Sequence, residues 1–304
     1  MSKEKMLFTD SLGGVSAAKD PAVVKFGGRY IMYYSVMPAV SNPSAGWGIG
    51  IAESHDLIHW DILGRVTPEG ELEAKGICAP GATVYDGKVH IFYQTYGGFQ
   101  NDAICHAYSS DGIHFIRNKT NPIVRAKGDW NIGRAIDADV CIFGGELYLY
   151  FATRNLNGNI QLLGVSKCPL DGKFERNSWE QCCDEAILKP ELEWEKECIE
   201  AAATLVRNGK VYMFYGGAFN NSPQQIGVAV SEDAVHFTRL FEEPFLKNGE
   251  WGSWNFCESG HPYIFEDEDG KTYLFYQGNN DWGKSWYLSM VEIGFEDGIP
   301  YIID

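Results

Sequence analysis

The chain has 304 residues and a formal net charge of −16, which disfavours nucleic acid as a partner because phosphate binding needs clustered Lys and Arg. The start, MSKEKMLFTDSLGG, lacks an apolar signal core, and no apolar run is long enough to span a bilayer. We therefore expect a cytoplasmic protein with a neutral ligand and no membrane partner. The sequence predicts no particular oligomeric state.

One design recurs five times along the chain, in which an acidic or alanine-rich start runs into a β-hairpin. The copies are DPAVVKFGGRYIMYY from Asp20, APGATVYDGKVHIFY from Ala79, DADVCIFGGELYLYF from Asp137, EAAATLVRNGKVYMFY from Glu200 and ESGHPYIFEDEDGKTYLFY from Glu258. The hairpin glycines recur at roughly sixty-residue intervals, slightly longer than typical propeller repeats; they are Gly28, Gly87, Gly145, Gly209 and Gly270. This pattern predicts an all-β fold, a five-bladed β-propeller.

The repeats fill the chain without a linker, so we predict a single domain over residues 1–304, with blades that start near residues 20, 79, 137, 200 and 258. We expect the residues before Asp20 and the final GIPYIID to close the ring or extend a blade. Eight cysteines without a CxxC pair, at positions 78, 105, 141, 168, 182, 183, 198 and 257, favour structural thiols over zinc.

Three acids at matched places in the repeat are the main functional signal. Asp20, Asp137 and Glu200 have nearly the same offset from their turn glycines, and the innermost strands of a propeller line its central channel. We therefore expect these carboxylates to be neighbours in space, where repulsion keeps one of them protonated near neutral pH. An Asp before a strand also caps turns, so Asp20 or Asp137 taken singly has a structural explanation.

The histidines fall into two groups. His59, His114 and His236 end the similar phrases ESHDLIHW, SSDGIHF and SEDAVHF, so we interpret them as packing or hydrogen-bonding residues of the outer strands. His261 instead lies at the inner-strand start of blade five, two residues after Ser259 in ESGHPYIF. There it can organise water or a cation at the axis.

Aromatic side chains near the funnel suit the apolar faces of sugar rings, although each tryptophan alone could equally be a core residue. The pair Trp251 and Trp254, just upstream of Glu258, is the best candidate platform. The further candidates for substrate binding are Trp47, Trp130, Arg134, Glu258 and His261. Arg134 stands nearly alone as a cation among the inner-strand starts, which disfavours phosphate as a co-substrate.

The hairpins resemble the blade signatures of glycoside hydrolase family 43 and its relatives. KDPAVVKFGGRYIMYYS is similar to the first-blade motif, which implies Asp20 as general base, and RAIDADVCIFGGELYLYF resembles the third-blade motif, which implies Asp137 as the acid that tunes pKa. IEAAATLVRNGKVYMFY is similar to the motif of the general acid, here Glu200. SGHPYIF resembles the blade-five motif whose histidine, His261, lies near a central water or calcium ion.

The chain departs from this pattern where Ala138 replaces a proline and Ala201–Ala202 replace a Gly-Pro pair. Glu197 before Cys198 resembles the acid motif of the fructosidase families 32 and 68, but it lies three residues further from Gly209 than the repeat predicts. We therefore favour Glu200 over Glu197.

The resemblance implies an exo-acting, inverting glycosidase for short oligosaccharides that end in arabinofuranose, another furanose or xylose. No cofactor is expected to be required, although a structural calcium ion at the axis, reached from His261 through water, fits the resemblance. The alternatives are a retaining β-fructofuranosidase-like hydrolase, with Asp20 as nucleophile, and a sugar-binding propeller without turnover; a phosphorylase is less favoured.

Overall fold

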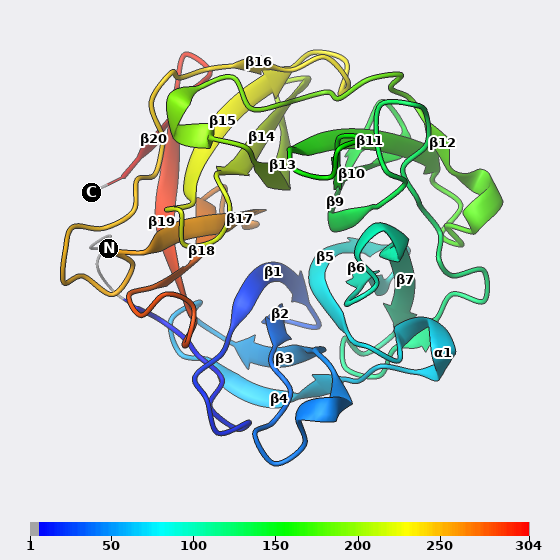
Figure 1. Ribbon diagram of the computed structural model, residues 1–304, viewed down its shortest axis with the longest axis vertical. Coiled ribbons are helices and arrows are strands. Elements are labelled where there is room, and N and C mark those ends of the chain that lie inside the picture. The colour runs from blue at the N-terminus through cyan, green and yellow to red at the C-terminus, as the bar shows by residue number, and fades with distance from the viewer. Residues whose placement is uncertain (1–5, 304) are drawn as a thin grey trace.

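The computed structural model describes residues 6–303 and confirms the five-bladed propeller. Five four-stranded antiparallel sheets surround a central axis, and each sheet is built from four strands that are consecutive in the chain (Figure 1). The molecule is a single domain. The innermost strands begin at Lys19, Ile77, Ile136, Ile199 and Glu258, within two residues of the expected blade starts.

In every blade the strands run in chain order from the axis outward. Blade one holds β1 (Lys19–Phe26), β2 (Arg29–Val36), β3 (Gly48–Ser54) and β4 (Asp61–Val66), and blade two holds β5 (Ile77–Tyr85), β6 (Lys88–Thr95), β7 (Ile104–Ser109) and β8 (Ile116–Arg117). Blade three holds β9 (Ile136–Phe143), β10 (Glu146–Arg154), β11 (Gln161–Pro169) and β12 (Glu180–Gln181). Blade four holds β13 (Ile199–Arg207), β14 (Lys210–Gly217), β15 (Gln225–Ser231) and β16 (Thr238–Arg239), and blade five holds β17 (Glu258–Glu266), β18 (Thr272–Asn279), β19 (Tyr287–Glu296) and β20 (Ile299–Ile302).

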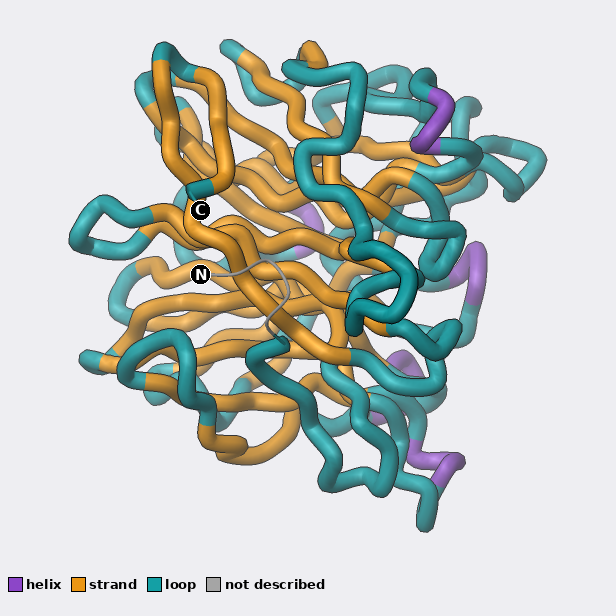
Figure 2. Tube along the Cα trace, turned by 90° about the vertical axis from the view of Figure 1, so that its left-hand side faces the viewer, coloured by secondary structure: helices purple, strands orange, loops and turns teal. Residues whose placement is uncertain are grey.

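The helices are short and lie in the connections. They are α1 (Gly70–Glu73) and the 3-10 turns η1 (Pro43–Ala45), η2 (Phe99–Asn101), η3 (Arg176–Ser178) and η4 (Glu193–Glu195). In Figure 2 most of the helices and many of the long loops lie on one side of the strands, which is the face viewed in Figure 1. No helix within residues 6–303 is long and apolar enough to cross a membrane.

The ring closes between the first and last blades. Phe8 forms a β-bridge with Leu288 and Ala17 with Trp286, so the segment before β1 pairs with the start of β19 in blade five. The chain's last strand, β20, is the outermost strand of that same blade. Both observations agree with the expected role of the two ends.

Local sequence explains the inner hairpins. In the Asp86–Gly87 and Asn208–Gly209 turns both central residues have positive φ, from 48° to 74°, which is the type I′ geometry that matches strand twist. The second strands that follow are rich in aromatic residues, and their rings fill the space between neighbouring sheets. Fully buried examples are Tyr34, Tyr93, Phe151, Tyr215 and Tyr276.

A buried carboxylate anchors the entry loop in three of the blades. Each accepts hydrogen bonds from a tyrosine on the second strand and an arginine on the fourth; the sets are Asp10 with Tyr34 and Arg65, Glu73 with Tyr93 and Arg117, and Glu195 with Tyr215 and Arg239. Moving one of these loops would separate the carboxylate from its arginine and leave a buried charge without a partner, which is costly. These sets of residues therefore fix the loops that lead to the inner strands.

The three blade-end histidines are structural. His59, His114 and His236 are exposed, and the Nδ1 atom of each lies 2.7 Å from the carboxylate of an aspartate three residues earlier. The prediction that they form hydrogen bonds is confirmed, but they lie in the turn before the outer strand and do not pack in it. All eight cysteines are free thiols.

Asp139 on β9 is a buried carboxylate of an inner strand that lies outside the pocket at the axis. It accepts hydrogen bonds from the backbone amide and the hydroxyl of Thr204 on β13, at 2.7 and 2.5 Å. Burial raises its pKa from 3.8 to about 7 despite these donors. The folded state therefore holds this proton more tightly than the unfolded chain does.

We predict that this carboxyl group makes the protein less stable as the pH rises. The stabilisation is complete below the unfolded pKa near 3.8 and is lost as the pH rises to the folded value of about 7. Asp139→Asn should remove this loss, on the order of 2 kcal/mol between pH 5 and 8, measured by urea unfolding. Asp184→Asn, at an exposed position, is the control; an identical pH dependence in wild type and Asp139→Asn would contradict the prediction.

Candidate active site

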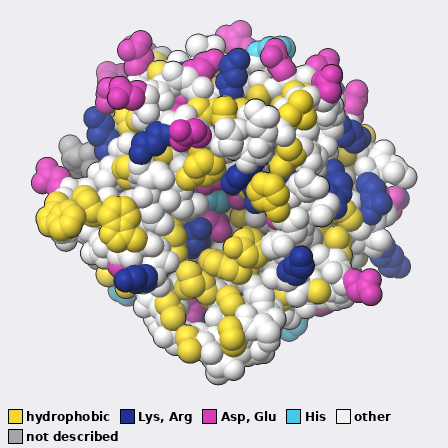
Figure 3. Space-filling model, viewed as in Figure 1, with side chains coloured by type: hydrophobic (Ala, Val, Ile, Leu, Met, Phe, Trp, Pro, Cys, Tyr) yellow, Lys and Arg dark blue, Asp and Glu magenta, His cyan; other side chains and the backbone are white. Residues whose placement is uncertain are grey.

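A cavity of about 230 Å³ opens at the propeller axis and receives side chains from all five blades. Figure 3 shows acidic and basic side chains close together in a hollow near the centre of this face. The lining residues that carry charge or hydrogen-bonding groups are Lys19, Asp20, Gln94, Arg134, Asp137, Arg154, Gln161, Glu200, Asn220 and His261, and the apolar and aromatic ones include Trp47, Tyr96 and Phe219. The three predicted acids therefore converge on one pocket.

A β-bulge at the start of each inner strand aims these side chains. The residue at the bulge has positive φ in all five blades: Asp20 (51°), Ala79 (47°), Asp137 (53°), Ala201 (54°) and His261 (42°). The pairing register of each inner strand shifts at the same place. Backbone in this strained conformation persists only where surrounding groups fix it, and it is common at functional sites.

Glu200 does not occupy the same place as the two aspartates. Asp20 and Asp137 are themselves the bulge residues, whereas Glu200 precedes its bulge residue, Ala201, by one position. The offsets are nearly the same, as expected, but Glu200 stands one residue further from its turn glycine than the two aspartates do. All three carboxylates line the pocket. Glu197, the rival acid, is exposed and does not line it.

Side-chain amides from neighbouring blades hold the bulges in place. The backbone N–H of Asp20 donates to Gln277 Oε1 at 2.9 Å, that of Asp137 to Gln94 Oε1 at 2.7 Å, and that of His261 to Gln224 Oε1 at 2.8 Å. Ser35 Oγ accepts from the amide of Ala79 at 2.7 Å in the same way. Four of the five bulges are thus fixed across a blade boundary.

Asp20 lies beside two basic groups. His261 Nδ1 is 3.1 Å and Lys19 Nζ 3.8 Å from its Oδ1 atom. Burial alone would raise the pKa of Asp20, but these neighbours outweigh burial and the pKa is lowered. Burial also lowers the pKa of His261, so Lys19 is the lasting positive charge next to Asp20 near neutral pH. Asp20 is therefore an ionised carboxylate, the state that a base needs.

Asp137 has the opposite character. Burial and the nearby Glu200 and Asp20 raise its pKa well above the usual value, because like charges cannot all ionise in one dry pocket. Glu200 receives amide hydrogen bonds from Gln161 and Gln224, the latter at 2.6 Å, and a longer one from Asn220 at 3.4 Å. A proton is thus retained within this group of acids above the pH at which an isolated aspartate loses it.

Glu258, which we expected among the substrate-binding residues, lies behind the pocket wall. It is 0% exposed, accepts a hydrogen bond from Gln277 Nε2 at 2.6 Å and another from the amide of Asn221 at 2.8 Å. Burial raises its pKa to about 7. Glu258 orients the glutamine that holds the amide of Asp20, so it supports the site from outside.

The other predicted binding residues divide in the same way. Trp47, Arg134 and His261 line the pocket, whereas three tryptophans lie elsewhere, so their expected place beside the funnel is wrong. Trp251 is 84% exposed on the surface, Trp254 is half-buried against Tyr276, and Trp130 lines a separate hollow between Lys127 and Cys183. The conformations of long loops decide these positions, and strand periodicity does not predict them.

Arg134 does not stand alone. Lys19, one residue before the bulge in blade one, and Arg154, at the end of β10, line the same pocket. The expectation that the site lacks a cluster of basic residues is therefore wrong. Sequence analysis named the acids and Arg134 but missed Lys19 and Arg154, because neither stands at a repeated position of the hairpins.

The metal proposed near His261 has little support from direct ligands. No group of three or more His, Cys, Asp and Glu side chains that could hold a metal ion occurs within residues 6–303. Nδ1 of His261 already faces Asp20, and the ammonium of Lys19 is close by. The residues present therefore do not fit a directly coordinated calcium ion, and a calcium ion held through water stays a prediction.

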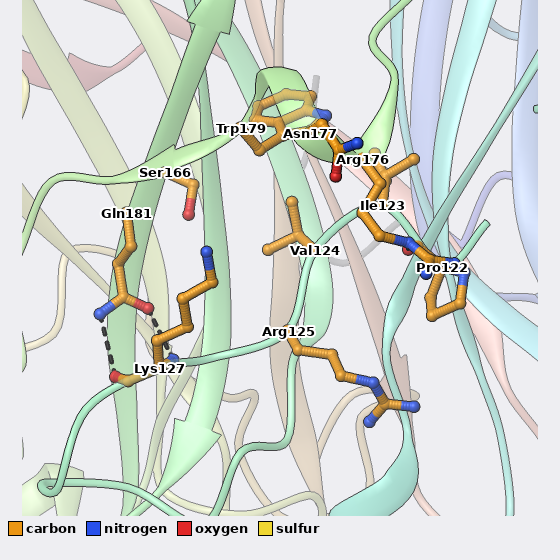
Figure 4. A pocket seen from close by; sticks show the side chains of 10 residues that line it. All are labelled: Pro122, Ile123, Val124, Arg125, Lys127, Ser166, Arg176, Asn177, Trp179 and Gln181. Carbon is orange, nitrogen blue, oxygen red and sulfur yellow. Dashed lines mark hydrogen bonds between the residues drawn. The ribbon is translucent and has the colours of Figure 1, made fainter. Parts of the chain in front are cut away.

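A second hollow, of about 400 Å³, lies at the outer side of blades two and three (Figure 4). It is lined by Arg125, Lys127, Arg176, Trp179 and Gln181 among others, and no carboxylate lines it. The side chain of Gln181 is held by the backbone of Lys127, and Arg176 donates to backbone carbonyls of residues 120–122. This hollow offers no acid–base pair.

The glutamines are the site residues that sequence analysis missed. Gln94 and Gln277 each follow the turn glycine of their hairpin by seven residues, in FYQ, so a repeat-based signal for them existed. In blade four this position is Gly216, and the side chain of Gln224, the residue before β15, fills the space. A Cβ on Gly216 would lie 3.0 Å from Cδ of Gln224. A Cβ on Gly260 would likewise lie 2.1 Å from Gln224 Oε1, which explains the glycine before His261.

Comparison with known proteins places this site in a family. Among solved structures, the chain is similar to a thermostable family-43 glycoside hydrolase (22% identity, 97% of this chain and 95% of that one, TM-score 0.76). It is also similar to an endo-1,4-β-xylanase from Bacteroides thetaiotaomicron (21%, 95% and 95%, TM-score 0.75) and to the GH32 β-fructofuranosidase of Bombyx mori (16%, 99% and 65%, TM-score 0.72). No curated protein sequence matches significantly.

At these identities the likeness shows the fold alone. The sequence profile described as Glycosyl hydrolases family 43 matches residues 15–300, nearly the whole chain. That match covers all five blades and every acid of the pocket. The chain belongs to glycoside hydrolase family 43.

Proposed function

We propose that the protein is an exo-acting, inverting glycosidase with Asp20 as general base, Glu200 as general acid and Asp137 as the acid that holds the proton in the pocket. The observation that carries this proposal is the convergence of three carboxylates in one pocket, two of which, Asp20 and Asp137, have opposite pKa shifts. The pKa of Asp20 is lowered and that of Asp137 is raised within one cavity. Environments that push the pKa values of acids apart support separate base and acid roles.

The chemistry uses one water molecule. Asp20 takes a proton from the water as its oxygen forms a bond to the anomeric carbon, and the bond to the leaving oxygen breaks on the opposite face. Glu200 gives its proton to that departing oxygen. Asp137, protonated beside both, limits the negative charge of the pocket and keeps a proton available to Glu200.

The size of the cavity supports action at a chain end. About 230 Å³ is below the usual range of ligand pockets, so it admits only the end of a chain, which is the terminal sugar and the nearest part of the leaving group. Trp47 and Tyr96, with ring centroids 5.7 Å apart, both line the cavity and offer apolar faces to a sugar. We therefore propose short oligosaccharides that end in arabinofuranose, another furanose or xylose as substrates.

Removal of either catalytic carboxyl group should abolish most turnover. Asp20→Asn and Glu200→Gln should each lower kcat by about two or more orders of magnitude, since general acid or base catalysis contributes roughly that much. Hydrolysis of chromogenic arabinofuranosides and xylosides measures the effect, with circular dichroism to check folding. Glu197→Gln, at the exposed rival position, should keep most activity. Near-normal rates in Asp20→Asn or Glu200→Gln would reassign that residue.

Gln277 should matter although it does not line the pocket. Gln277→Ala removes the acceptor for the amide of Asp20 and the donor to Glu258. We predict that kcat falls about 10- to 100-fold with little change in KM, because a small displacement of the base is costly for the reaction and not for binding. Gln181→Ala, a glutamine of the outer strand β12, is the matched control. Equal kcat values in the two variants would contradict this positioning role.

A further inference from the structure

Two of the three cations in the pocket lack a close carboxylate partner. Lys19 is paired with Asp20 and lies 4.4 Å from the ring of Trp286. Arg154 forms no ion pair with any residue of the described range 6–303, and its hydrogen bonds go to Gln161 Oε1 at 3.0 Å and to the carbonyl of Gly158 at 3.0 Å. A guanidinium bound only to neutral acceptors keeps capacity for an anion.

Arg134 is similarly unsatisfied. Its nearest carboxylate oxygen, Asp102 Oδ2, is 3.9 Å away, and burial raises the pKa of Asp102, which weakens it as a counterion. The Nε atom of Arg134 is buried without a hydrogen-bond partner, and its Nη1 atom reaches Gln161 Oε1 only at 3.4 Å. Unpaired buried donors are costly, so a ligand that satisfies them gains affinity.

The two guanidinium groups are held close to each other against the same aromatic ring. Arg134 lies 5.5 Å and Arg154 5.3 Å from the centroid of Phe99, and Arg154 is also 5.2 Å from that of Phe219. Burial and the charge of Arg134 lower the pKa of Arg154, which reflects repulsion between the groups. This arrangement is preorganised for a planar or tetrahedral oxyanion.

The arginine pair lies on the Glu200 side of the pocket. Gln161 accepts from both arginines through Oε1 and donates through Nε2 to Glu200. Asp20 instead lies beside Lys19 of its own blade and His261 of blade five. In the proposed function Glu200 protonates the departing oxygen. A group bound beside Glu200 therefore belongs to the departing part of the substrate.

We propose that Arg134 and Arg154 form a subsite for an oxyanion on the leaving group, so that the preferred substrates are glycosides whose departing part carries a carboxylate or a phosphate ester. This inference rests on the proposed function for the identity of the leaving side. It differs from the neutral ligand expected from the acidic net charge, because the charge of this pocket depends on the residues that line it.

Two aryl glycosides of the same sugar, identical except for a carboxylate on the leaving aryl ring, test the proposal. Wild type should favour the carboxylated one in kcat/KM, and the preference should fall about 10-fold or more in Arg154→Met, since charged hydrogen bonds are worth about that much. Arg154→Lys keeps the positive charge but cannot make bidentate hydrogen bonds, so it should retain only part of the preference for the carboxylated substrate. Arg207→Met, which removes a surface arginine paired with Glu266, should leave the preference unchanged.

A binding measurement separates this proposal from the hydrolase assignment. Calorimetric titration with glucuronate should show binding to wild type and weaker binding to Arg154→Met. Glucose should bind wild type much more weakly than glucuronate does. This result does not depend on whether the two aryl glycosides are hydrolysed. Equal binding of glucuronate and glucose, or an unchanged preference in Arg154→Met, would overturn the oxyanion subsite. If inorganic phosphate is instead consumed to form a glycosyl phosphate, the anion acts as the nucleophile and the assignment to the leaving group is wrong.

Discussion

The hydrogen bond from a side-chain amide to the backbone N–H of an inner-strand bulge is the interaction on which the site depends. At the bulge the chain adopts positive φ at non-glycine residues, and such backbone persists only where neighbouring groups fix it. Gln277, Gln94 and Gln224 supply that constraint from adjacent blades. The ring of blades thereby fixes the positions of Asp20 and Asp137, which are more than a hundred residues apart in the chain.

The same amides link the acids to their surroundings. Gln224 joins the amide of His261 to the carboxylate of Glu200, and Gln277 joins the amide of Asp20 to the buried Glu258. Because each amide donates with one atom and accepts with the other, its orientation is determined by the network. This framework also distributes the charges of the pocket. Lys19 lies beside Asp20, and Arg134 and Arg154 lie on the side of Glu200.

Sequence analysis identified the architecture because its signals are local. Turn pairs such as Asn208–Gly209 and alternating strands recur five times, and the acids Asp20 and Asp137 stand at fixed offsets from the hairpin turns. The one-residue displacement of Glu200 is visible in its offset, because Ala201 and not Glu200 matches the place of Asp20 and Asp137 before the turn glycine. The offset alone does not show that the side chain before the bulge also reaches the pocket. Gln224 was missed because it does not stand at the repeat position of Gln94 and Gln277, which is Gly216 in blade four. Its side chain occupies the space beside that glycine from another part of the chain. Trp251 was wrongly expected near the axis because the conformation of its loop decides where it lies. Arg154 was overlooked because it reaches the axis from the end of β10, where no repeated motif marks it.

Activation of water by Asp20 opposite Glu200 is the step that the proposed mechanism requires. This step determines the anomeric configuration of the product when it first forms. Proton NMR measures that configuration before mutarotation changes it. An inverting site needs its two carboxyl groups about 6.5 to 9.5 Å apart, to admit water, whereas a retaining site holds them at about 5 to 5.5 Å. We expect a product that first appears with inverted configuration. Retained configuration, or a glycosyl group trapped covalently on Asp20, would contradict this mechanism and would indicate a nucleophilic one of the kind proposed for the fructofuranosidase alternative.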